Sequence, residues 1–202
     1  MQRRFSIALG FLFLVLTMTV HLRLWQSLDW AALAAMQNAL PHTVDLPFSI
    51  FSLLGSAEVT ALIFLALLFA IHATNRLPMI LAFGVATVIE LVGKRFVYQP
   101  ITPHELLRYI PILPIFSSVI NPGFSFPSGH ALRTTFIVIV LASLTTTRNL
   151  SRVAKNIIYA TLVLIEVVML VSRLYLAEHW LTDVIGGAML GAAFALVVVK
   201  RQ

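Results

Sequence analysis

The sequence has no cysteine and few charged residues. Only 11% of its 202 residues are Asp, Glu, Lys or Arg, whereas 59% are hydrophobic, and the mean hydropathy is +0.95. Soluble domains carry about 25% charged and about 45–50% apolar residues, so this composition is typical of a membrane protein. The lack of Cys excludes disulfides, thiolate metal ligands and a cysteine nucleophile, and it leaves the redox compartment undetermined.

Acidic residues are also scarce, which leaves a formal net charge of +6. The Lys and Arg residues lie mostly at the ends of apolar segments and form no basic stripe with interleaved aromatic residues. This pattern is typical of membrane topology and excludes a nucleic-acid partner. The length predicts one membrane-embedded domain over residues 1–202, and the oligomeric state stays open.

Six apolar runs reach the length of about 17–25 residues that a helix needs to cross a bilayer. They lie near residues 5–22, 57–73, 79–96, 129–146, 157–174 and 180–199. A backbone in lipid must satisfy its own hydrogen bonds, so all six are expected to be helices. The predicted fold class is therefore all-α, a polytopic membrane protein with six transmembrane helices and a long loop between the third and the fourth.

The first run resembles a signal peptide in its basic start, but Arg23, Asp29 and two Trp residues separate it from Ala32-Leu33-Ala34. We therefore expect an uncleaved anchor, followed by a helix near residues 25–40 that lies in the headgroup region. Asp29 falls on its apolar face and argues against this position in the headgroup region; anchoring and lipid docking are both open as roles of the helix.

Basic residues also predict the orientation, since Lys and Arg are more frequent in cytoplasmic segments. With both termini in the cytoplasm, that side carries most of them: Arg3, Arg4, Arg76, Arg148, Arg152, Lys155, Lys200 and Arg201. The loops after the third and fifth spans then share the outer face. The first of these loops, residues 97–128, holds six of the nine prolines, which predicts a largely non-helical segment, and its apolar stretch 110–116 suggests contact with the membrane surface.

Residues 127–130 read Pro-Ser-Gly-His and open the fourth span. A helix N-terminus offers free N–H groups and a positive dipole end to an anion. Ser128 can add a hydroxyl, Gly129 lets a ligand approach the backbone, and His130 can exchange a proton. An ordinary capped helix with a chance histidine explains the same four residues equally well.

A second group of polar residues surrounds the start of the sixth span. Arg173 can bind phosphate oxygens in a bidentate manner, and His179 and Asp183 are four residues apart, so that the carboxylate could orient the imidazole. A helix-end salt bridge is the alternative, although ionisable groups at membrane depth are costly and favour a function. Lys94 ends the third span one turn after Glu90, where it either binds an anion or extends to the interface.

These segments resemble the type 2 phosphatidic acid phosphatase superfamily, whose motifs are Lys-x6-Arg-Pro, Pro-Ser-Gly-His and Ser-Arg-x5-His-x3-Asp. The second motif is complete at residues 127–130, and the third is complete at Ser172, Arg173, His179 and Asp183. The resemblance covers roughly residues 90–200. The first motif departs from the pattern, because Ile101-Thr102 stands where the family has Arg-Pro; Arg95 and Arg108 are the candidates for the missing guanidinium.

The resemblance implies a lipid phosphatase in which His179 attacks phosphorus, Asp183 orients it and His130 acts as acid and base. It implies that Lys94, Ser128, Gly129 and Arg173 bind the phosphate, with no metal or cofactor, at an extracytoplasmic active-site loop of a bacterial inner membrane. His104 and Glu105 also lack the spacing of a metal site with the two histidines.

Several questions remain open from the sequence. Phosphatidate, phosphatidylglycerol phosphate and a polyprenyl pyrophosphate are all candidate substrates. Phosphoryl transfer to a second lipid would use the same fold, and a transporter with Glu90 and Glu166 as ion-relay groups is the alternative outside enzymes. A soluble haloperoxidase-like activity is disfavoured by the six spans. Glu166 is expected to form a buried pair with Arg133, and Glu178 is expected to be a surface acid.

Overall fold

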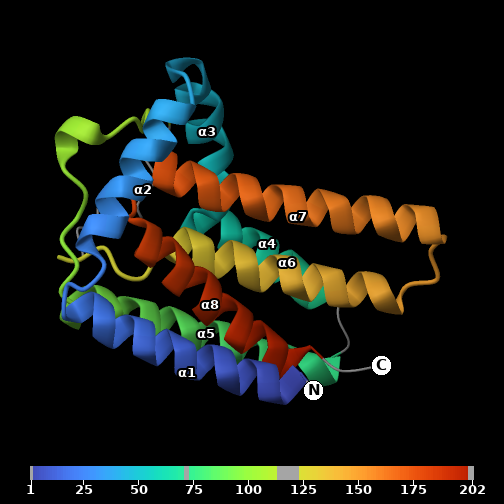
Figure 1. The fold of residues 1–202 in the computed structure, drawn as a ribbon. Helices are drawn as coiled ribbons and strands as arrows, with labels where there is room; N and C mark the ends of the chain where they lie inside the picture. The colour runs from blue at the N-terminus through green and yellow to red at the C-terminus, as the bar shows by residue number, and fades with distance from the viewer. Residues whose placement is uncertain (1, 71–72, 113–122, 200–202) are drawn as a thin grey trace.

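The chain folds into a bundle of α-helices. A computed structural model describes residues 2–70, 73–112 and 123–199. The α-helices are α1 (Gln2–His21), α2 (Gln26–Ala39), α3 (Asp45–Ser52), α4 (Ala57–Ala70), α5 (Ala73–Phe96), α6 (Gly129–Thr147), α7 (Arg152–Tyr175) and α8 (Leu181–Val198), with short 3-10 turns η1 (His42–Val44), η2 (Leu53–Gly55) and η3 (His104–Leu106). No strand occurs in these ranges, which confirms the all-α prediction (Figure 1).

Five helices of the described ranges are long and apolar enough to cross a bilayer: α1, residues 76–96 of α5, α6, α7 and α8. The second expected span differs from the prediction of one helix over residues 57–73. Helix α4 has only 14 residues and, at 1.5 Å per residue, is too short to cross alone. It follows another helical segment, His42–Gly55, across a bend of 49°, and this bent pair is either a broken sixth span or a re-entrant loop.

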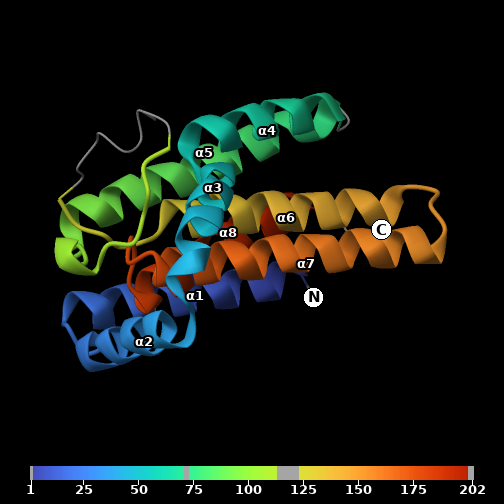
Figure 2. The same cartoon turned by 90° about the horizontal axis from the view of Figure 1, so that it is seen from above.

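Helix α8 lies at the centre of the bundle and packs most extensively against α6 and α1 (Figures 1 and 2). Its contact with α6 is close because glycines face that helix: a Cβ on Gly187 would lie 2.2 Å from the Ser128 carbonyl oxygen, and one on Gly191 would lie 2.3 Å from that of Leu132. Small residues four apart allow such backbone contact in membranes. Apolar side chains on the outer faces of α1 and α7, such as Phe11 and Leu164, are exposed, as lipid-facing residues are.

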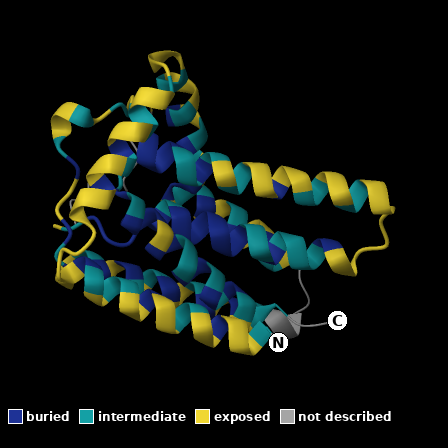
Figure 3. Ribbon diagram, viewed as in Figure 1, coloured by how far each residue is buried: buried dark blue, intermediate teal, exposed yellow. Residues whose placement is uncertain are grey.

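The two ends of the bundle differ. The chain enters α1 and leaves α8 at one end, whereas the loops after α5 and α7 meet at the other (Figure 1). Buried residues concentrate where α6, α7 and α8 approach these loops (Figure 3). Residues 97–112 contain only the short turn η3, as the prolines predict, and residues 113–116 of the apolar stretch lie outside the described residues. The polar residues of both motifs are thus brought to one end of the bundle.

Candidate active site

The N-terminus of α6 is fixed against the N-terminus of α8. The Ser128 N–H donates to the Asp183 carbonyl oxygen at 2.9 Å, and the Ser128 hydroxyl accepts the Ala131 N–H at 3.4 Å as the helix cap. A hydroxyl that accepts in this way can still donate its own hydrogen. Ser128 therefore caps the helix and keeps one donor for a ligand.

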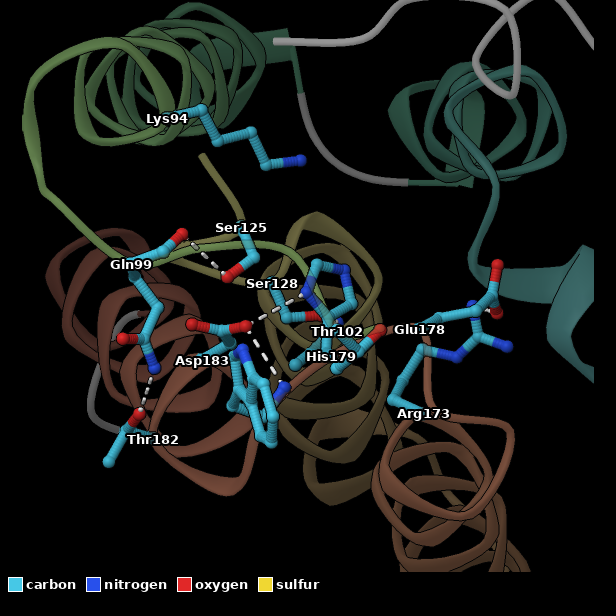
Figure 4. A network of polar contacts seen from close by, with 12 residues as sticks. Lys94, Gln99, Thr102, Ser125, Ser128, Arg173, Glu178, His179, Thr182 and Asp183 are labelled. Atoms are coloured by element: carbon cyan, nitrogen blue, oxygen red, sulfur yellow. Dashed lines mark hydrogen bonds and ion pairs between the residues drawn. The ribbon is translucent and has the colours of Figure 1, made fainter. Parts of the chain in front are cut away.

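His179 lies in the turn that joins α7 to α8, where Ala177 has a positive φ of 55°. Its Nδ1 is 3.3 Å from Oδ2 of the fully buried Asp183, and the same oxygen accepts the Trp180 N–H at 3.0 Å (Figure 4). The two side chains meet because Asp183 caps the start of α8, whereas the sequence suggested that they stack on one helix. The pairing leaves Nε2 of the imidazole for a substrate.

The electrostatic surroundings keep His179 neutral. Burial, followed by the positive charges of Lys94 and Arg173, lowers the pKa of the imidazole from 6.5 to about 3. A neutral imidazole has a lone pair that can attack an electrophile, whereas an imidazolium has none. A ring with this pKa is neutral at physiological pH, as the predicted role of His179 as a nucleophile requires.

Arg173 is completely buried at the end of α7, and its Nη1 forms an ion pair with Glu178. This contact corrects the expectation that Glu178 is a surface acid: the turn after α7 folds back and brings the carboxylate to the guanidinium. Nε and Nη2 of Arg173 are buried and have no hydrogen-bond partner among the described residues. These two groups form one edge of the guanidinium, and such an edge can bind two phosphate oxygens side by side.

Lys94 and His130 complete the group that the motifs predict. The Lys94 side chain extends from α5 toward the side where Ser128 and His179 lie, and its Nζ is 2.9 Å from Glu90 (Figure 4). His130 lies within electrostatic range of Arg173 and His179. The structure thus gathers at one end of the bundle all seven residues named as catalytic or phosphate-binding: Lys94, Ser128, Gly129, His130, Arg173, His179 and Asp183.

Neither candidate for the missing guanidinium joins this group. Arg95 is exposed. Arg108 donates to the Tyr175 hydroxyl at 2.9 Å and to the Leu40 carbonyl oxygen at 3.5 Å, and its guanidinium lies 5.0 Å from the Tyr175 ring. Arg108 therefore fixes the loop to the end of α7.

The expected pair of Glu166 and Arg133 does not form. Arg133 donates to Glu90 Oε2 at 3.1 Å, and Glu166 accepts a hydrogen bond from Thr135. Residues two apart in a helix point about 200° from each other, so Arg133 and Thr135 face different neighbours, α5 and α7. Only the rotation of α6 in the bundle decides which carboxylate Arg133 meets.

Asp29 is the residue whose role the sequence did not show. It is buried on α2 and accepts the Thr182 N–H at 2.9 Å, the Thr182 hydroxyl at 2.8 Å and the Gln99 amide at 3.0 Å. Burial raises the pKa of the Asp29 carboxyl above 3.8, and these hydrogen bonds oppose the shift. Helix α2 is thus held against the N-terminus of α8. The one sequence feature that could have indicated this contact is an acidic residue, Asp29, on the apolar face of the predicted helix.

A metal centre finds no support in the described ranges, where no three His, Cys, Asp or Glu side chains are placed to hold an ion. His104 and Glu105 are exposed on η3. The fold and its polar end define the class, a polytopic membrane protein with a cluster of ionisable side chains at one end of the helix bundle.

Comparison with known proteins gives the family. The model of the PAP2 superfamily matches residues 75–202, and the chain belongs to this superfamily. It is similar to phosphatidylglycerophosphatase B of Bacillus subtilis (strain 168), with 27% identity over 199 residues that cover 95% of this chain and 92% of the relative. Relatives of this kind are lipid phosphate hydrolases, and this chain is a membrane lipid phosphatase.

Two solved structures share the fold. The transmembrane PAP2-type phosphatidylglycerolphosphate phosphatase of Bacillus subtilis has a TM-score of 0.75 and 26% identity, with 96% of this chain and 93% of that chain covered. Aquifex aeolicus LpxE has a TM-score of 0.59 and 26% identity, with 86% and 96% covered. Both agree with the architecture of membrane-spanning helices described above.

Proposed function

We propose that the enzyme hydrolyses lipid phosphate monoesters through a phosphohistidine at His179. The observation that carries this proposal is the arrangement of two groups: the neutral, half-buried imidazole of His179 beside Asp183, and the edge of the buried Arg173 guanidinium that has no partner among the described residues. A phosphate held by that edge would place its negative charge among fixed donors, where electrostatic stabilisation is largest.

The reaction proceeds in two steps. In the first, His179 Nε2 attacks phosphorus, the bond to the lipid oxygen breaks, and His130 gives that oxygen a proton. In the second, His130 takes a proton from water, the water oxygen attacks phosphorus, and the N–P bond breaks to release phosphate. Lys94, Ser128 and the Gly129 N–H stabilise the equatorial oxygens in both steps.

Phosphatidylglycerol phosphate is the first substrate to test, because two similar proteins bear names that refer to it. Phosphatidate and a polyprenyl pyrophosphate present the same terminal phosphate. The basic residues support cytoplasmic termini, which would place the site on the extracytoplasmic face of a bacterial inner membrane.

The decisive experiment measures phosphate release by purified protein in detergent with a chelator, from each of these three lipids. Release that is lost in His179→Ala supports the proposal and identifies the substrate. An acid-labile phosphoprotein should be trapped when wild-type turnover is stopped rapidly by a denaturant at alkaline pH, and His179→Ala should never form it. Release without any such intermediate would refute the phosphohistidine, and phosphorylated acceptor lipid in place of free phosphate would indicate transfer.

A further inference from the structure

Three ionised side chains lie together beneath the N-terminus of α6. Glu90 on α5 is only 3% exposed, and its two oxygens bind different cations: Oε1 lies 2.9 Å from Lys94 Nζ, and Oε2 lies 3.1 Å from Arg133 Nη1. Arg133 is itself 8% exposed. One carboxylate therefore joins two cations in a site that water hardly reaches.

This triad is in direct contact with the residues expected to hold phosphate. A Cβ on Gly129 would lie 2.0 Å from Glu90 Oε1 and 2.7 Å from Arg133 Nη1. Arg133 Nε donates to the Gly55 carbonyl oxygen at 3.2 Å, and a Cβ on Gly55 would lie 2.7 Å from His130 Cδ2. The guanidinium thus lies between the backbone of Gly129 and the residue that flanks His130.

Charge explains why the second cation matters. Glu90 and Lys94 alone would form a neutral pair, and the lysine would offer little net field to a phosphate. With Arg133 the three groups carry a net charge of +1. Buried charges are weakly screened, so a change of one unit beside a phosphate site has a large effect.

We propose that Arg133 is a positioning residue for phosphate binding: it neutralises Glu90 and so keeps the charge of Lys94 available to the substrate. Arg133 also supplies a positive charge in place of the arginine of the first motif, whose position is occupied in this chain by the exposed Ile101. This inference rests on the phosphate site proposed above. Its competitor is a purely structural role, in which Arg133 only satisfies the Gly55 carbonyl oxygen at the bend before α4.

Orthovanadate inhibition separates the two roles, because a structural role changes thermal stability but not the inhibition constant of the folded enzyme. We expect Arg133→Gln, with a net local charge of zero, to weaken inhibition about 10- to 100-fold, the range for a charged contact. The double variant Glu90→Gln/Arg133→Gln restores the net charge of +1. Its inhibition constant for orthovanadate should therefore lie within about threefold of the wild-type value. Arg133→Lys keeps the charge and should retain most of the affinity.

The matched control is Arg152→Gln, which removes an exposed charge at the start of α7 and should leave inhibition unchanged. Unchanged inhibition in Arg133→Gln, or a double variant as weak as Arg133→Gln, would overturn the proposal. Should Arg133→Gln fail to fold, Glu90→Gln decides: tighter inhibition supports the charge argument, and weaker inhibition refutes it. A wild type that releases no phosphate would instead refute the proposed function itself.

Discussion

The contact between α6 and α8 predicts a large effect from one added methyl group. In Gly187→Ala the new Cβ would lie 2.2 Å from the Ser128 carbonyl oxygen and 3.1 Å from the Leu132 nitrogen, which are backbone atoms that no side-chain rotation can move. Ordinary contact needs about 3.5 Å, so the helices must separate by roughly 1 Å. This separation moves Ser128 away from Asp183, whose carbonyl oxygen now accepts its N–H.

A displacement of about 1 Å between catalytic groups costs about 100-fold in rate, and overpacking costs about 1–3 kcal/mol in stability. We therefore expect Gly187→Ala to lower phosphate release about 100-fold and to lower the midpoint of thermal unfolding in detergent. Gly10→Ala and Gly84→Ala are the controls, because an added Cβ there meets no atom within 4 Å. The reasoning fails if Gly187→Ala keeps more than half of the rate while both controls behave like wild type.

Three further predictions concern the polar groups. Asp183→Asn should reduce turnover by as much as about 10⁴-fold with little change in KM, since the amide cannot hold the imidazole in its reactive tautomer; a loss that appears only in KM would contradict this role. Gly129→Ala should weaken orthovanadate inhibition, because the added Cβ would displace the Arg133 guanidinium, 2.7 Å away, together with Glu90; unchanged inhibition would contradict this reasoning. The pKa of His179, lowered from 6.5 to about 3, means that the folded protein binds no proton there while the unfolded chain does. Stability should therefore fall as the pH drops from about 6.5 toward about 3. His179→Ala should lack this component in pH-dependent unfolding, and an identical pH profile in the variant would contradict it.

Local patterns in the sequence were enough for the architecture and for the core of the site. Apolar runs longer than soluble helices need predicted membrane helices, because lipid leaves the backbone no other hydrogen-bond partners. The motifs around His130 and His179 could be located because each is contiguous and lies at a helix start. Gathering both at one end of the bundle followed from the alternating direction of the spans.

Contacts between distant segments needed the tertiary structure. Sequence spacing predicted that Glu90 lies one turn from Lys94, but it gave Arg133 the wrong partner, because it does not determine how α6 is rotated against α5 and α7. The sequence did not predict the bend before α4 for the same reason. At this bend the Gly55 carbonyl oxygen accepts a hydrogen bond from Arg133, a side chain of another helix. Periodicity shows which residues share a face, and packing alone decides what that face meets. The sequence by itself thus determined a membrane phosphatase, and the helix packing decided which charged side chains lie beside the proposed phosphate site.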